Sequence, residues 1–224
     1  CFPFFYGKKT AGIFQNDAEV AAYKNADGGL IQPKAKPGDV RFVDVNGDGK
    51  IDDGDRTKIG KGMPDWTYGF NFYVNYKNLD LSAVFQGTIG NDIYDATRRT
   101  DLQAVNLPSY MWGRWTGEGT SNKIPRFTWA DDNNNWLSSD LYVKDGSYLR
   151  LKNIQLGYTL PKMLTRKVLV DGIRFYVAAE NLLTFTKYEG FDPEVGDSGG
   201  KSIGIDRGCY PQARTYTFGL NINF

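Results

Sequence analysis

Apolar and polar residues alternate along five stretches of this chain. The last stretch, Thr215–Phe224, is the clearest, because every even position is apolar and every odd position is polar or small. Alternation with a period of two predicts a β-strand that has two different faces. The predicted strands are 66–76, 79–89, 147–160, 173–185 and 214–224.

The connections between these strands alternate between short and long. Lys77 and Asn78 alone separate the first two strands, which predicts a hairpin, and 161–172 is a compact connection with one helical turn. The connections 90–146 and 186–213 are long and rich in Gly, Asn, Asp and Pro. Long irregular connections are unusual in compact soluble domains, but membrane β-barrels have short turns at one end and long loops at the other. The sequence therefore predicts one antiparallel meander.

The alternation changes frame inside the third predicted strand. Leu149 and Leu151 are on one face of a regular strand, whereas Ile154 and Leu156 are on the other. One extra residue in a strand restores the frame, so we expect a β-bulge near Lys152–Asn153.

The predicted fold class is all-β: the carboxy-terminal antiparallel strands of a large transmembrane β-barrel with long extracellular loops. One face of each strand would contact outer-membrane lipid and the other a polar lumen. Trp66, Tyr68 and Tyr76 lie near strand ends, as in the aromatic girdles of such barrels. In the final strand Phe218, Leu220, Ile222 and Phe224 share the apolar face, and we expect this strand to close the barrel.

The same pattern predicts an orientation. Short turns are periplasmic in outer-membrane barrels, which places the carboxy terminus in the periplasm and 1–65, 90–146 and 186–213 outside the cell. We divide the chain into a loop region, 1–65, and a barrel region, 66–224. Five strands are fewer than the roughly eight of the smallest barrel, so we expect the other strands upstream or on another chain.

Composition excludes several kinds of protein. The chain has 41% hydrophobic and 15% aromatic residues, but no apolar run approaches the ~18 residues of a transmembrane helix. A formal net charge of +1 gives no electrostatic footprint for nucleic acid. The absence of histidine excludes imidazole catalysis and most zinc sites. No nucleophile stands beside a base, so we expect no enzymatic activity.

The segment 44–55 has the residue spacing of a calcium-binding loop. Oxygen-bearing side chains alternate along it, and Gly49 stands where such loops turn sharply. The expected ligands are Asp44, Asn46, Asp48, the carbonyl of Lys50, Asp52 and Asp55. Hard oxygen ligands favour Ca²⁺ over softer metals, and its role would be structural. The alternative is a cluster of Asx turns closed by hydrogen bonds.

The long connection 90–146 holds five aromatic residues that are candidates for contact with a substrate or partner: Tyr110, Trp112, Trp115, Trp129 and Trp136. Aromatic faces stack on sugar rings, but loop aromatics also pack the loop itself. Two short helices are expected elsewhere, at 16–23 with Asn16 or Asp17 as its cap and at 92–102.

Several segments resemble the SusC/RagA-like TonB-dependent outer-membrane transporters of Bacteroidetes. They are Pro37–Asp44 leading into the calcium-like loop, Gly60–Phe70, Ser147–Tyr158, Glu180–Tyr188, Gly190–Glu194 and the last strand. The resemblance implies a barrel of about 22 strands with an internal plug. It also implies energy supplied through TonB by upstream regions, and a SusD-like surface lipoprotein that captures glycan or peptide.

Two functions fit the sequence. The first is part of a nutrient importer of the bacterial outer membrane, and the second is a soluble calcium-dependent carbohydrate-binding β-sandwich. The direction of the apolar strand faces distinguishes them, because a sandwich buries these faces in a shared interior and a barrel turns them outward to lipid.

Overall fold

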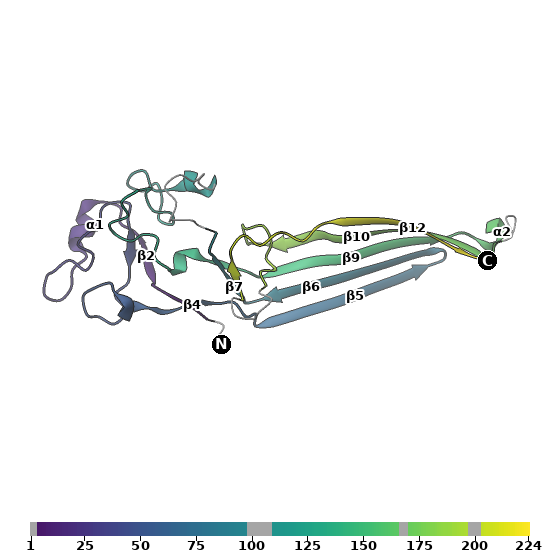
Figure 1. Ribbon diagram of the computed structural model, residues 1–224, viewed down its shortest axis with the longest axis horizontal. Helices are drawn as coiled ribbons and strands as arrows, with labels where there is room; N and C mark the ends of the chain where they lie inside the picture. Colours follow the sequence, from purple (N-terminus) through teal and green to yellow (C-terminus); the bar gives the residue numbers. More distant parts are fainter. Residues whose placement is uncertain (1–3, 98–108, 166–169, 197–202) are drawn as a thin grey trace. The chain divides into compact units, whose positions relative to one another are not determined.

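The computed structural model describes residues 4–97, 109–165, 170–196 and 203–224, which form two compact units (Figure 1). Unit 1 comprises Cys1–Gly62, Ile93–Lys144 and Ile205–Arg207. Unit 2 comprises Met63–Asp92, Asp145–Gly204 and Gly208–Phe224. Each unit therefore combines segments that are far apart in the sequence.

Unit 2 is built on one sheet of five long antiparallel strands, which lie side by side in Figure 1. They are β5 (Trp66–Tyr76), β6 (Leu79–Ile89), β9 (Tyr148–Thr159), β10 (Gly172–Thr186) and β12 (Thr215–Asn223). Their order in the sheet, β5-β6-β9-β10-β12, is their order in the chain. This confirms the predicted all-β class and the predicted meander. The sheet is open, with β5 and β12 at its edges.

The predicted bulge is present in β9. Val84 and Phe85 are neighbours on β6, but their partners on β9 are Asn153 and Leu151, which leaves Lys152 as an extra residue. The register between β9 and β10 shifts at the same level. Leu151 therefore faces Phe85 while Leu156 faces Leu81, so apolar residues on both sides of the bulge share one face of the sheet.

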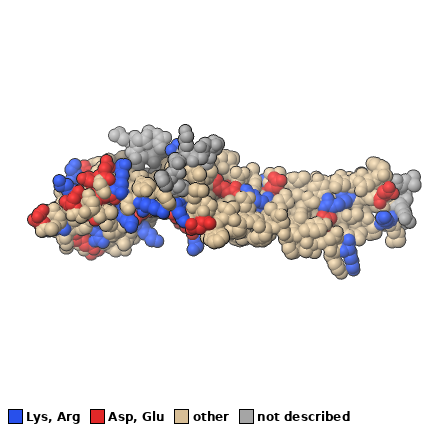
Figure 2. Space-filling view, turned by 90° about the horizontal axis from the view of Figure 1, so that it is seen from below, with Lys and Arg blue, Asp and Glu red and all other residues tan. Residues whose placement is uncertain are grey.

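The apolar face of the sheet is exposed. Phe70 pairs with Phe85, and their rings stack with centroids 4.8 Å apart, yet Phe70 is 51% exposed. Phe218 at the other edge is 77% exposed. A β-sandwich would bury these side chains in a shared interior, so the structure contradicts the sandwich alternative. Figure 2 shows few charged side chains along this sheet compared with the surface of unit 1.

An ion pair crosses three strands on the polar face. The guanidinium of Arg174 on β10 donates to both carboxylate oxygens of Asp80 on β6, at 3.0 and 2.5 Å. Gly157 of β9 lies between them, and a Cβ atom there would come within 2.3 Å of Arg174 and 2.5 Å of Asp80. The glycine is thus required for the close approach of the pair.

Unit 1 consists of short elements joined by ordered turns. Its elements are β1 (Phe4–Gly7), β2 (Thr10–Ile13), α1 (Asp17–Ala22), β3 (Val40–Phe42), η1 (Asp53–Asp55), β4 (Thr57–Lys61), η2 (Ser109–Gly113), η3 (Asp140–Tyr142), most of β7 (Asp92–Asp95) and β8 (Val143–Asp145), and β11 (Ile205–Asp206). The strands pair as β1-β4, β2-β3 and β11-β7-β8. Phe14, Val40, Phe42 and Ile93 are fully buried and form part of its core.

The predicted helices have different outcomes. Helix α1 is confirmed with Asn16 as its cap, since the Asn16 side chain accepts a 3.0 Å hydrogen bond from the amide of Glu19. The helical turn in 161–172 is α2 (Lys162–Thr165). The helix expected at 92–102 is wrong for 92–95, which forms β7, and 98–102 lies outside the described residues. Parallel pairing of Tyr94 with Ile205 and burial of Ile93 outweigh the local helical tendency.

Among the helices that the structure describes, none has the length and apolar character needed to span a membrane.

Adjacent residues on β5 test the expectation that the apolar face contacts lipid. Phe72 is on the apolar face near the middle of the strand, and Asn71 is on the polar face. We expect Phe72→Arg to lower the free energy of barrel unfolding by about 2–4 kcal/mol, and Asn71→Arg to have little effect, because arginine is costly only on the lipid side. Denaturant unfolding in lipid vesicles measures both changes. Equal effects of the two substitutions would contradict this assignment of the faces.

Candidate functional site

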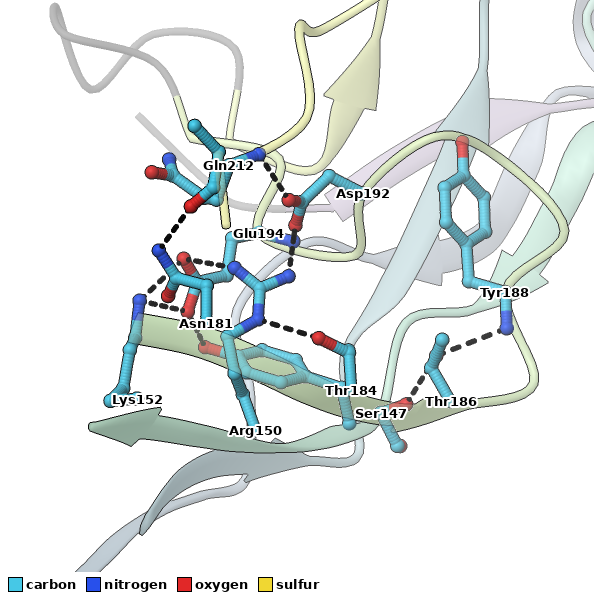
Figure 3. A network of polar contacts seen from close by, with 12 residues as sticks. Ser147, Arg150, Lys152, Asn181, Thr184, Thr186, Tyr188, Asp192, Glu194 and Gln212 are labelled. Carbon is cyan, nitrogen blue, oxygen red and sulfur yellow. Dashed lines mark hydrogen bonds and ion pairs between the residues drawn. The ribbon is translucent and has the colours of Figure 1, made fainter. Parts of the chain in front are cut away.

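Among the described residues of unit 2, a cluster of ionic contacts centres on Arg150 of β9 (Figure 3). Its Nε donates to the hydroxyl of Thr184 at 2.9 Å, Nη1 donates to Glu194 at 3.1 Å and Nη2 donates to Asp192 at 2.7 Å. All three guanidinium nitrogens are therefore hydrogen-bonded. The Arg150 side chain is only 3% exposed, so these acceptors compensate for the loss of water around a buried charge.

Glu194 is held by three donors from β9. Tyr148 donates its hydroxyl to Glu194 at 2.9 Å, and the Lys152 ammonium lies 2.8 Å from the same carboxylate oxygen. Arg150 contacts the other oxygen. These three residues are at alternate positions of one strand, so their side chains project from the same face. Lys152 is also the bulged residue, and bulges commonly redirect a side chain in this way.

Asp192 connects the strand to a second segment of chain. One of its oxygens accepts from Arg150 and from the amide of Glu194, and the other accepts from the amide of Gln212 at 2.9 Å. Asn181, which has a positive φ of 53° in β10, donates its side-chain amide to the carbonyl of Ala213 at 3.0 Å. The cluster therefore fixes residues 192–194 and 212–213 at one end of the sheet.

The surroundings of Asp192 change its acidity. Burial raises the pKa of this carboxyl, but hydrogen bonds from the amides of Gln212 and Glu194 and from Arg150, together with the charge of Arg150, outweigh that effect. The net result is a pKa below the usual value, so Asp192 stays ionised in mild acid.

Sequence reasoning missed this cluster. The acidic residues 189–194 look like the solvated charge of a loop, since nothing nearby in the sequence pairs with them. The available signal was Arg150, which stands at a polar-face position between Leu149 and Leu151 of a strand. A cation there needs a nearby anion when the strand end is covered.

The calcium-like loop is closed by its own hydrogen bonds. Asp44 accepts from the amides of Gly47 and Gly49, both at 2.7 Å. Asp55 is fully buried and accepts from the amides of Val45 and Asp52. The remaining expected ligands Asn46, Asp48 and Asp52 each accept one amide of the loop as well, from Asp48, Lys50 and Gly54. This is the hydrogen bonding of an Asx-turn cluster.

The fit of this loop to a metal ion depends on where its oxygens converge. Among the described residues no three acidic, cysteine or histidine side chains lie together in a way that would hold a metal ion. The buried Lys8 ammonium donates to the main-chain oxygen of Asp52, which places a cation beside the loop. The calcium site therefore stays a prediction.

The five candidate aromatic residues all lie in unit 1 but differ in exposure. Trp112 is 85% exposed and Trp129 is 69% exposed. Tyr110, Trp115 and Trp136 are half-buried. Trp115 donates its indole N–H to Gln15 at 3.2 Å, so it helps to pack the loop. Trp112 and Trp129 are therefore the members of the set that are available for contact.

The residues expected at barrel closure lie on β12 or directly after it. Phe218, Leu220 and Ile222 pair with apolar residues of β10, namely Val177, Phe175 and Ile173. Phe224 follows the strand and is 91% exposed. Their closing role stays a prediction.

The acidity of Asp192 predicts how stability depends on pH. Because its folded pKa is depressed, its stabilisation is complete above the unfolded value of about 3.9 and is lost as the pH falls through the folded value. The destabilisation by Asp192→Asn should therefore be equal at pH 7 and pH 5 and smaller near pH 3. Denaturant unfolding at the three pH values measures this, with the exposed Asp132→Asn as control. If the destabilisation by Asp192→Asn is already smaller at pH 5 than at pH 7, the pKa of Asp192 is not depressed as predicted.

Calcium binding can be tested on the intact protein. We expect calorimetry to show heat on addition of Ca²⁺ and a chelator to lower the melting temperature, with both responses lost in Asp48→Ala. Asp53→Ala is the matched control, since Asp53 lies in the same loop but is exposed and pairs with Arg56. A wild-type protein that gives neither heat nor a shift in melting temperature has no calcium site here.

The sequence of this chain is similar to those of several TonB-dependent receptors. A protein named TonB-dependent receptor P3 from Formosa agariphila is 38% identical over 229 residues, which cover 98% of this chain and 22% of that protein. The TonB-dependent receptor SusC of Bacteroides thetaiotaomicron is 31% identical over 197 residues, covering 87% of this chain and 18% of SusC. No family model matches the chain. The chain thus spans about a fifth of the length of these curated relatives.

Comparison of the fold with solved structures also identifies a transporter of this kind. A chain of the solved RagAB peptide transporter superposes on this one with a TM-score of 0.70 and 26% identity, covering 99% of this chain and 23% of the other. These proteins are receptors and transporters, in agreement with the prediction that the chain is not an enzyme. By sequence and by fold, the chain belongs to the SusC/RagA-like family of TonB-dependent receptors.

Proposed function

We propose that this chain forms part of a TonB-dependent importer that takes up nutrients across the bacterial outer membrane. The main support is the five-stranded sheet, whose apolar face remains exposed while its other face is polar. Such a surface is unfavourable in water, where each large apolar side chain costs about 1.5–3 kcal/mol when left exposed, but it suits contact with lipid.

The proposal includes a direction across the membrane. Short connections join β5 to β6 and β9 to β10, and these lie at the same end of the sheet because the strands are antiparallel. In this proposal that end and the carboxy terminus face the periplasm, and the segments 1–65, 90–146 and 186–213 are extracellular. TonB would act through parts of the importer outside the stretch that this chain matches.

The proposed partner is a SusD-like surface lipoprotein, and the proposed substrate is a glycan or a peptide. Supporting evidence comes from the relatives, one of which is named SusC while another belongs to a peptide transporter. The exposed Trp112 and Trp129 offer aromatic faces for stacking on a sugar ring or an apolar side chain. Calcium in the loop 44–55 would add only structural support.

Uptake by cells that carry the full-length receptor tests this function. We expect accumulation of a labelled peptide mixture or a labelled oligosaccharide panel to require TonB, and to fall about tenfold when Trp112 and Trp129 are both changed to Ala, equivalent to about 1.4 kcal/mol of lost contact. Trp115→Ala is the matched control for loop packing. Outer-membrane fractionation confirms equal amounts of each variant, and co-purification detects the lipoprotein. Uptake that continues without TonB would refute the proposal.

A further inference from the structure

Residues 187–214 leave β10 and return to β12, and among the described residues of this connection the Asp192 carboxylate contacts both limbs. Asp192 is on the outgoing limb, 187–196, and Gln212 is on the returning limb, 208–214. The Asp192 oxygen Oδ1 accepts from Arg150 of β9, while Oδ2 accepts from the amide of Gln212. Asp192 therefore contacts the sheet with one oxygen and the returning limb with the other.

Glu194, two residues further on, makes contacts of a different kind. Its side chain contacts Tyr148, Arg150 and Lys152, all of which belong to β9. No side-chain hydrogen bond or ion pair that the structure gives for Glu194 reaches the returning limb. Glu194 thus fastens the outgoing limb to the sheet, whereas Asp192 also connects the two limbs (Figure 3).

The two carboxylates also differ in burial. The side chains of Arg150 and Asp192 are 3% and 5% exposed, while Lys152 and Glu194 are 28% and 18% exposed. A buried pair is little screened by salt and leaves an uncompensated charge when one partner is removed. A partly exposed pair is weaker, because water competes for both charges.

Each limb presents an exposed aromatic side chain close to this pair. Phe191 precedes Asp192 and is 75% exposed, and Tyr210 stands two residues before Gln212 and is 91% exposed. Both aromatics lie within two residues of a position that Asp192 occupies or contacts. A fixed backbone lowers the entropy lost when such side chains bind a partner.

We propose that the Arg150–Asp192 pair is a clamp that makes the two limbs move as one strap. Opening the pair loosens both limbs together with Phe191 and Tyr210, while the sheet below stays folded. Loss of the Glu194 contacts loosens the outgoing limb alone. Asp192 is thus a positioning residue for both limbs, whatever substrate the importer carries.

Hydrogen exchange measured by mass spectrometry on the full-length receptor in detergent tests the clamp. In Asp192→Ala we expect amide exchange to rise about tenfold or more in both limbs, the effect of about 1.4 kcal/mol in the opening equilibrium. In Glu194→Ala we expect a similar rise in 189–196 and less than about a threefold rise in 208–213. Exchange in β9 and β10 should stay at the wild-type rate in both variants.

Two further measurements extend the test. Asp192→Asn retains the size of the side chain and one acceptor oxygen, so it replaces Asp192→Ala if that variant fails to fold, with the same pattern expected in both limbs. Raising the salt concentration to 1 M should loosen the outgoing limb of the wild type, through the Lys152–Glu194 pair, more than the returning limb.

The proposal is refuted if the returning limb is unchanged in both Asp192 variants. Equal patterns for the Asp192 and Glu194 variants, or faster exchange throughout β9 and β10, would also overturn it.

Discussion

Hydrogen bonding between neighbouring strands is the constraint on which the rest of unit 2 depends. Each strand places its side chains alternately on two faces, and the pairing register decides which residues share a face. With Trp66 opposite Ile89 and Tyr76 opposite Leu79, the apolar residues of β5 and β6 form one continuous surface. A shift of one residue would turn polar side chains such as Asn71 toward that surface, so register and surface chemistry are inseparable here.

In each unit an ionic cluster holds a long connection in place. Long connections run over the surface of a protein, and polar contacts help to fix their position. In unit 1 the fully buried Asp39 accepts from Arg126 at 2.7 Å and from Asn135 at 2.9 Å, which joins the segment before β3 to the connection after η2. Arg150 and Asp192 have the corresponding role in unit 2. Removing one partner of a buried pair costs about 3–5 kcal/mol, so the Arg150–Asp192 pair strongly favours one arrangement of its connection.

The strands and the bulge could be predicted from the sequence because both are local patterns. Period-two alternation is visible within ten residues, and the change of frame between Leu151 and Ile154 requires an extra residue wherever the strand pairs. The ionic cluster and β7 could not be predicted in this way. Arg150 meets Asp192, and Tyr94 meets Ile205, only after long segments have folded back. These contacts join positions that are distant in the sequence, so the alternation of residues within one segment does not predict them.

The bulge at Lys152 also bears on how such a protein can change over evolution. Its extra residue is accommodated at the level where the register between β9 and β10 also shifts. A strand of this sheet can therefore gain a residue only where a bulge accommodates it, or its apolar and polar faces exchange beyond that point. Insertions and deletions should accordingly accumulate in the connections, while paired strands keep their lengths in step with one another.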